Sequence, residues 1–86
     1  MITPFPPHPF PLWSLRRNWE RDWDVTSCLL THSPFGHELQ LLRNERLVWC
    51  QVFANSIDAL NAAKHERERL ILEGWIPHPL TIRRAE

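Results

Sequence analysis

Residues 47–53, Leu-Val-Trp-Cys-Gln-Val-Phe, form an unbroken run of side chains that favour a β-strand. Successive side chains of a strand point to opposite faces of its sheet, so the run divides into two sets. The first set is Leu47, Trp49, Gln51 and Phe53, and the second is Val48, Cys50 and Val52. Both sets are mainly apolar, whereas a strand with one wet face would alternate apolar and polar residues. We therefore expect this strand to be covered on both faces.

A helix is predicted directly after this strand, near residues 56–73, with Asn55 or Ser56 capping its first N–H groups. Alanine, leucine, arginine, glutamate and lysine dominate the segment and favour a helix, and Gly74 marks its end. Apolar residues spaced three and four apart predict the face that packs on the sheet. That face consists of Ile57, Leu60, Ala63, Leu70 and Ile71. Arg67 lies in the same stripe, either with its stem along the edge of the core or in an ion pair with an acid such as Glu38.

Two further strands are predicted upstream, near residues 23–31 and 37–43, with a turn that contains proline and glycine between them. A tight hairpin loop then leads into the third strand, near residues 46–53. The predicted fold class is α+β: a three-stranded antiparallel β-meander packed on one C-terminal α-helix. A chain of 86 residues allows one domain, which we place at residues 14–80.

The domain is flanked by apolar segments that contain proline. Residues 1–13 hold five prolines and should form an extended N-terminal arm near polyproline II, because proline removes backbone donors and restricts φ. Residues 75–80, Trp-Ile-Pro-His-Pro-Leu, are similar in character, and residues 81–86 should fray. The arms either cover the remaining face of the sheet in the same molecule, or dock on a partner or on a second copy of the chain.

The chain has ten basic and ten acidic residues, so its formal net charge is zero. This balance argues against a dedicated surface for nucleic acid or for anionic membranes. It also removes the charge repulsion that keeps many proteins monomeric. The N-terminus lacks the pattern of a secretory signal, and no stretch approaches the ~20 apolar residues of a membrane span. We therefore expect a cytoplasmic protein that does not contact a membrane.

Five tryptophans and four phenylalanines are many for so short a chain. Large rings either fill a small core or form the hot spots of an interface. Together with the two-sided apolar strand, they favour a non-catalytic protein-interaction module. Its partner would be another protein or a second copy of the chain, which would give a homo-oligomer such as a homodimer. The candidate contact residues are Phe5, Phe10, Trp13, Trp19, Trp49, Phe53 and Trp75.

Two cysteines and two histidines near the predicted strands are of the types that bind zinc. They are Cys28, His32, His37 and Cys50, with the spacing Cys-x3-His-x4-His-x12-Cys. Because this is not a standard spacing of zinc ligands, we predict no metal and no other cofactor. The sequence also contains no Gly-rich phosphate loop and no nucleophile with an evident base and orienting group, so we predict that the protein is not an enzyme.

The run of residues 47–63, a strand that ends in Phe followed by a helix that begins with Asp-Ala, resembles a recurrent pattern of short, uncharacterised bacterial proteins, as does Gly74-Trp75 after the helix. More loosely, it is similar to the last strand and helix of AP2 and integrase-arm DNA-binding domains. Those domains combine a three-stranded sheet with one helix and read DNA with the sheet. The resemblance implies a small DNA-binding module as the alternative function. The residues that would contact DNA are Arg16, Arg17, Arg43 and Arg46.

Overall fold

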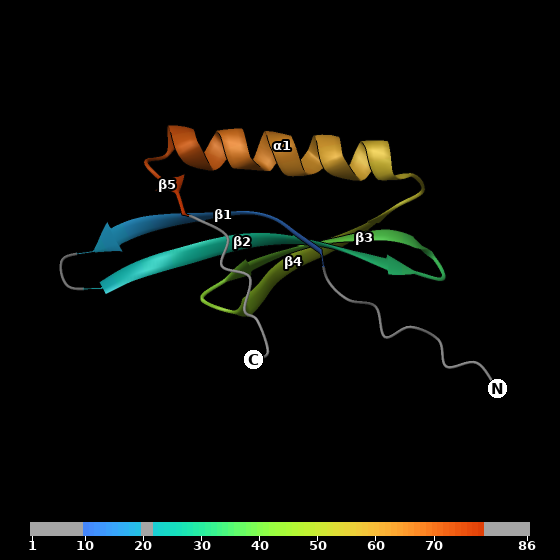
Figure 1. Ribbon diagram of the computed structural model, residues 1–86, viewed down its shortest axis with the longest axis horizontal. Coiled ribbons are helices and arrows are strands. Elements are labelled where there is room, and N and C mark those ends of the chain that lie inside the picture. The colour runs from blue at the N-terminus through green and yellow to red at the C-terminus, as the bar shows by residue number, and fades with distance from the viewer. Residues whose placement is uncertain (1–9, 20–21, 79–86) are drawn as a thin grey trace, which may run out of the picture.

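The computed structural model describes residues 10–19 and 22–78, with the side chains of Trp19 and Asp22 excepted. Four long strands precede one helix: β1 (Phe10–Trp19), β2 (Asp22–Ser33), β3 (Gly36–Arg43), β4 (Arg46–Phe53) and α1 (Ser56–Leu72), followed by the short strand β5 (Ile76–Pro77). The strands form an antiparallel sheet with α1 lying across one face (Figure 1). The predicted α+β class, with an antiparallel meander and a C-terminal helix, is therefore confirmed.

The predicted number of three strands is too low, because β1 forms partly from the predicted N-terminal arm and partly from residues 14–19, for which no strand was predicted. Pro11 is tolerated in this strand because it stands at its start, where the pairing with β2 shifts register between Pro11 and Trp13. Beyond that shift, Trp13 and Leu15 point to the face that α1 covers and are buried. Residues 1–9 and 79–86, which include most of the predicted arm and the whole predicted tail, lie outside the described residues.

The sheet has the strand order β4-β3-β2-β1-β5, so β4 forms one edge and β5 the other. A two-residue turn joins β3 to β4, and both of its residues have positive φ, 54° at Asn44 and 70° at Glu45. These values are typical of a type I′ turn, whose twist matches that of the flanking strands. The Asn44 side chain also accepts a hydrogen bond of 2.9 Å from the N–H of Val25, which ties the turn to β2.

The core lies between α1 and one face of the sheet. Its buried members include Trp13, Leu15, Cys28, Leu30, Leu39, Leu41, Ala59, Ala63, Leu70 and Trp75. The Trp13 indole donates a hydrogen bond of 3.1 Å to the carbonyl of Ala63, so its one polar group is satisfied inside the core.

Both ends of α1 agree with the local sequence signals. Asn55 is the N-cap and its side chain accepts a hydrogen bond of 2.8 Å from the N–H of Asp58. Gly74 follows the helix with φ of 106°, a conformation that glycine adopts without strain.

The predicted packing face of α1 is only partly correct. Ala63 and Leu70 are buried as expected, but Ile57, Leu60 and Ile71 are exposed, by 68%, 45% and 36%. Ala59 is buried instead. The face of α1 against the sheet thus contains two alanines, and the three larger apolar residues point away from the core. Arg67 is half-buried, as expected for a residue at the edge of the packed face.

The face of the sheet that points away from α1 is here called the distal face. It is formed by side chains that alternate with the core residues along each strand: Ser14, Arg16, Trp23, Val25, Ser27, Leu29, Thr31, Glu38, Gln40, Leu42, Leu47, Cys50 and Val52. Leu47 was expected on the same face as Trp49. The pairing with β3 shifts between Leu41 and Leu42, so one extra residue in β4 reverses the parity and turns Leu47 to the distal face.

Candidate interaction surface

Two of the aromatic residues predicted to make intermolecular contacts, Trp13 and Trp75, belong to the core. Only 1% of Trp75 is exposed, although it follows the end of α1. The guanidinium carbons of Arg17 and Arg43 lie 4.6 Å and 5.0 Å from the centroid of a Trp75 ring, so two cations stack on this residue. Trp13 and Trp75 are therefore buried core residues and are not available for contacts with a partner.

The other predicted aromatic residues divide between the surface and the part that is not described. Phe10 is exposed at the start of β1, and Trp49 and Phe53 are half-buried on the α1 side of β4. Phe5 and the side chain of Trp19 lie outside the described residues. Trp23, which is not among the predicted contact residues, is half-exposed on the distal face. The sequence shows that Trp23 shares a parity with Val25 and Leu29, but parity alone does not reveal which face of the sheet the helix covers.

The two edges of the sheet differ in how they are protected. The outer edge of β1 is paired with β5 at Leu15 and Arg16, and the N–H of His78 donates a further hydrogen bond of 2.9 Å to the carbonyl of Ser14. Among the described residues, β4 is paired on one side only, with β3. Its outer edge is therefore a row of backbone N–H and C=O groups that could pair with another strand.

The side chains of β4 do not discourage such pairing. Leu47, Val48 and Val52 are exposed by 57%, 49% and 47%. The only charged residue of the strand is Arg46, at its first position. Natural edge strands are commonly blocked by lysine, proline or a bulge. The extra residue of the β4 bulge is Val48, between the paired residues Leu47 and Trp49, so residues 49–53 remain a regular, uncharged edge.

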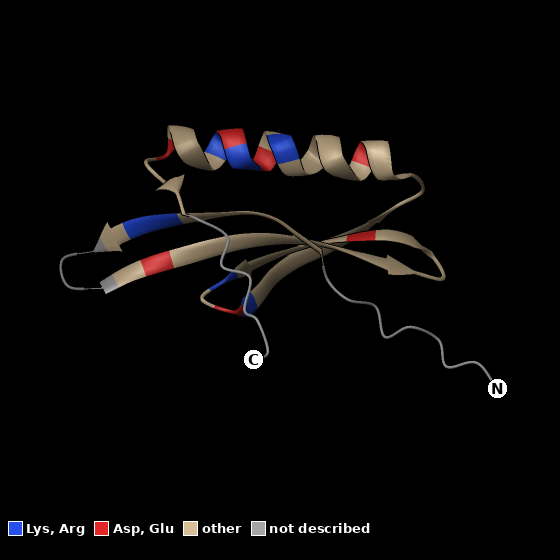
Figure 2. Cartoon of the chain, viewed as in Figure 1, with Lys and Arg blue, Asp and Glu red and all other residues tan. Residues whose placement is uncertain are grey.

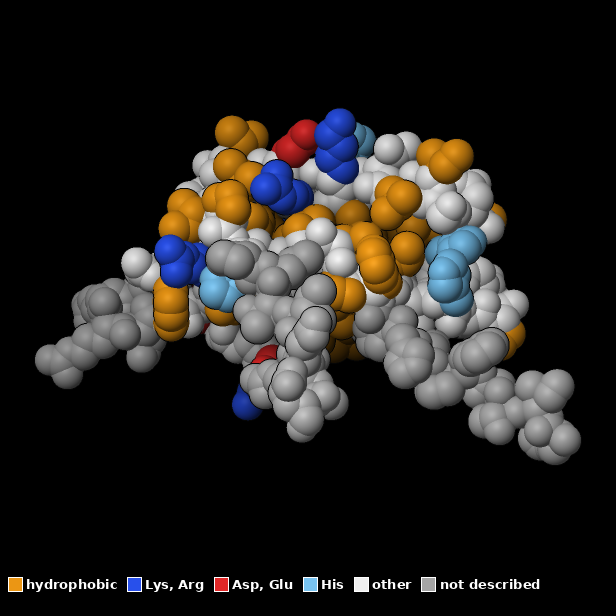
Figure 3. Space-filling view, viewed as in Figure 1, with side chains coloured by type: hydrophobic (Ala, Val, Ile, Leu, Met, Phe, Trp, Pro, Cys, Tyr) orange, Lys and Arg blue, Asp and Glu red, His pale blue; other side chains and the backbone are white. Residues whose placement is uncertain are grey.

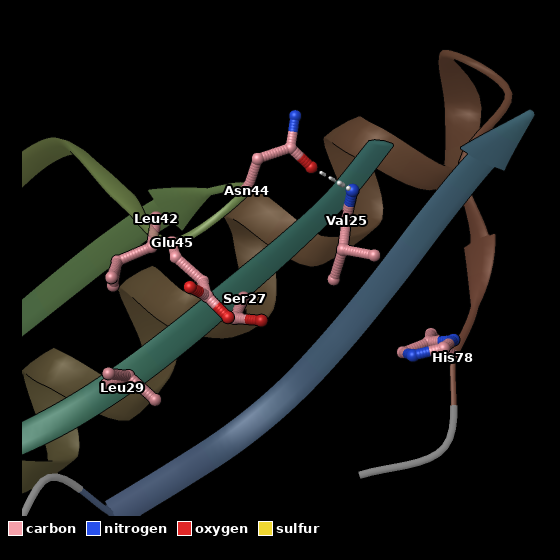
Figure 4. Close-up of a pocket in the computed structure, with 7 residues that line it drawn as sticks. All are labelled: Val25, Ser27, Leu29, Leu42, Asn44, Glu45 and His78. Atoms are coloured by element: carbon pink, nitrogen blue, oxygen red, sulfur yellow. Dashed lines mark hydrogen bonds between the residues drawn. The ribbon is translucent and has the colours of Figure 1, made fainter. Parts of the chain in front are cut away.

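The distal face also carries an open pocket of about 590 Å³ next to the turn between β3 and β4. Apolar and polar side chains from β2, β3, the turn and the segment after β5 line it (Figure 4). The lining residues are Val25, Ser27, Leu29, Leu42, Asn44, Glu45 and His78. The pocket has a volume suited to a small molecule or to apolar side chains of a protein. Ser27, Glu45 and His78 are among the lining residues, and the Ser27 hydroxyl shares a hydrogen bond of 2.9 Å with the Ser14 hydroxyl.

Hydrophobic side chains also reach the surface between α1 and the sheet (Figure 3). The outer side of α1 adds Ile57, Leu60 and Leu72 to the exposed apolar residues. These residues are spread along the helix among charged neighbours, including Arg69, which pairs with Glu66 and, at 2.6 Å, with Glu73. The helix surface is therefore more mixed in character than the uncharged edge of β4.

The four arginines proposed for DNA contacts do not lie on one surface. Arg17 and Arg43 stack on Trp75 on the α1 side of the sheet, whereas Arg16 lies over Trp23 on the distal face, 4.8 Å from the ring centroid. Arg46 is exposed at the tip of the hairpin. Figure 2 shows basic residues separated along the sheet and the helix, with acidic residues close to each group. This arrangement gives no continuous basic surface within the described residues.

The four residues with zinc-binding side chains are likewise divided between the two faces. Cys28 is buried in the core below α1, and Cys50 is exposed on the distal face. His32 and His37 lie opposite each other on β2 and β3, with ring centroids 4.8 Å apart. Because the two thiols are on opposite faces, they cannot bind the same ion together with these histidines. No cluster of three potential metal ligands occurs in the described part of the chain.

The environment of each thiol disfavours the thiolate. Burial raises the pKa of Cys28 from 9.0 to about 12, and the nearby Glu66 carboxylate adds to the effect. A hydrogen bond to the Glu38 carboxylate raises the pKa of Cys50. Since the thiolate is the nucleophilic form of cysteine, neither residue is activated for catalysis.

Comparison of the chain with protein-family models, curated proteins and solved structures finds no match. Among residues 10–19 and 22–78, no helix has both the length and the apolar character needed to cross a lipid bilayer. The function therefore has to be inferred from the surface of this chain alone.

Proposed function

We propose that this protein is a small, non-catalytic protein-interaction module that associates with a second copy of itself through the outer edge of β4. The observation that carries the proposal is the difference between the two edges of the sheet. One edge is capped by β5, whereas residues 49–53 at the other edge are paired with β3 alone among the described residues and carry no charged side chain. Such an edge favours the addition of another strand.

The exposed side chains of β4 support the same proposal. Leu47 and Val52 project from the distal face, and Trp49 and Phe53 are only half-buried on the α1 side. A strand added beside β4 would therefore remove apolar surface from water on both faces of the sheet. The burial of such surface is the main favourable contribution to most protein association.

The charge of the chain makes a second copy a suitable partner. The formal net charge is zero, so two copies do not repel each other through their overall charge. Within β4 the only charge is at Arg46, which leaves the rest of the edge neutral. An edge of this kind can meet itself without placing like charges opposite each other.

The test is to place a charge at the edge and measure the mass in solution. Val52→Lys introduces a cation beside the outer edge of β4, at a position that is already 47% exposed, so the fold should tolerate it. By light scattering, we expect twice the mass of one chain for the wild type and the mass of a single chain for Val52→Lys.

The matched control is Leu72→Lys, which places the same charge at an exposed position at the end of α1, away from β4. This variant should keep the mass of the wild type. A wild type that is monomeric at all accessible concentrations, or equal masses for Val52→Lys and the wild type, would contradict the proposal.

A further inference from the structure

We infer that two copies pair their β4 strands antiparallel about Gln51, so that the two sheets join into one continuous sheet. This inference rests on the proposed self-association and specifies its geometry. In a twofold-symmetric dimer, identical edge strands meet in antiparallel fashion, and the symmetry axis passes through one position of the strand. The question is which residue of β4 lies at that axis.

The bulge in β4 selects the axis. It leaves Val48 without a partner on β3, so the regular edge runs from Trp49 to Phe53. The middle residue of this stretch is Gln51, which is exposed. Pairing about Gln51 uses all five regular residues of both copies and keeps the bulge outside the paired segment.

The side chains of the two copies match in this register. Trp49 lies opposite Phe53 of the second copy, and this pair occurs twice, once on each side of the axis, because of the symmetry. Both residues are half-buried on the α1 side, so the contact joins apolar surface to apolar surface. On the distal face, Cys50 lies opposite Val52 of the second copy, also twice. Directly opposite pairs of this kind are the main side-chain contribution to the pairing of strands.

The charge of β4 does not oppose this register. Arg46, the one charged residue of the strand, lies five positions from Gln51, so the two copies of Arg46 stand at opposite ends of the joined strands. Like charges are therefore not placed opposite each other.

Moving the symmetry axis by one residue, from Gln51 to Cys50, gives a less favourable register. Pairing about Cys50 would place Trp49 opposite Gln51 of the second copy and would set the bulged Val48 against Val52. It would thus replace two aromatic contacts with contacts between an aromatic ring and an amide, and it would include the irregular part of the strand.

Disulfide cross-linking separates these registers. The test uses the full chain with Cys50→Ser, which leaves only the buried Cys28, and adds Gln51→Cys. Residues directly opposite in an antiparallel pair have Cα atoms ~4.5–5.5 Å apart, within the range that a disulfide bridges. Under mild oxidation, Cys50→Ser/Gln51→Cys should convert to a covalent dimer. In that bond the two thiols at position 51 lose two protons and two electrons to the added oxidant, molecular oxygen or a disulfide reagent.

The matched control is Cys50→Ser/Val48→Cys. Position 48 is also exposed on β4, but in the inferred register the two copies of this position are separated by six residues along the strands. This variant should stay free of covalent dimer under the same conditions, and so should the wild type, whose Cys50 faces Val52 of the second copy.

The outcomes distinguish this inference from the proposed function. Covalent dimer from native Cys50 in preference to Gln51→Cys would overturn the register about Gln51. Equal cross-linking of the position 48 and position 51 variants would also overturn it, because collisions alone would account for both. A doubled mass without cross-linking at position 51 would overturn edge pairing in this register and leave self-association standing. A monomeric mass would overturn both.

Discussion

At the scale of single residues, Cys28 shows how burial in the core changes the pKa of a thiol. Its thiol is buried on β2 under α1, and burial together with Glu66 raises its pKa to about 12. Cys50 has an exposed thiol on the distal face. The sequence alone grouped the two as candidate ligands, because spacing along the chain does not reveal which face of a sheet a residue occupies. Their separation depends on the pairing of β4 with β3, which only the tertiary structure defines.

The raised pKa of Cys28 predicts a loss of stability at alkaline pH. In the unfolded chain this thiol ionises near its ordinary pKa of 9.0, whereas in the folded protein it ionises near 12. Its contribution to stability is therefore complete below pH 9 and is lost progressively as the pH rises toward 12. The denaturant midpoint of the wild type should fall more steeply above pH 9 than that of Cys28→Ala, in which no thiol remains at this position. Parallel pH profiles for the two proteins would contradict this assignment.

Local signals at single residues were the part most accurately predicted from the sequence. Asn55 caps α1, Gly74 ends it, and the tight loop between β3 and β4 falls where it was expected. Each of these depends on the chemistry of one or two residues with their own backbone. The role of Trp75 could not be predicted in this way, because its burial depends on Arg17 and Arg43 from distant strands.

At the scale of elements, the bounds of β2, β3, β4 and α1 agree with the predicted ranges to within two residues. The strand β1 was missed because its prolines suggested an extended arm and the residues after Trp13 are mostly polar. Antiparallel pairing with β2 overrides both signals after Pro11. The helix was placed correctly along the chain but was assigned the wrong rotation, since spacing alone favours large apolar residues over Ala59.

The observed rotation of α1 about its axis changes which substitutions should cause a large loss of stability. Trp75→Ala removes a ring that is 1% exposed and should cost about 3–5 kcal/mol of unfolding free energy. Leu60→Asp, at a position that the sequence pattern places on the packing face, should change stability by less than about 1 kcal/mol because this residue is 45% exposed.

Chemical denaturation of Trp75→Ala and Leu60→Asp, each compared with the wild type at neutral pH, tests this assignment. A larger loss of stability in Leu60→Asp than in Trp75→Ala would mean that the helix packs through the face that the sequence predicted.

At the scale of the whole molecule, one helix covers one face of a sheet whose other face and one edge remain without a partner element among the described residues (Figure 1). The presence of an apolar surface beyond the single helix could be inferred from the two-sided apolar pattern of residues 47–53. The predicted meander also places residues 46–53 at an edge of the sheet. The protection of the opposite edge could not be inferred, because it depends on β1, which lies beside β2 and is itself covered by β5.

The central claim, that the outer edge of β4 joins two copies of the chain, is tested most directly by amide hydrogen exchange measured over a series of protein concentrations. We predict that amides within residues 49–53 whose N–H groups point away from β3 exchange fast in dilute protein and become protected as the concentration rises, while exchange in β2 and α1 does not change. Fast exchange of these amides at every concentration, including those at which light scattering reports a doubled mass, would contradict the account.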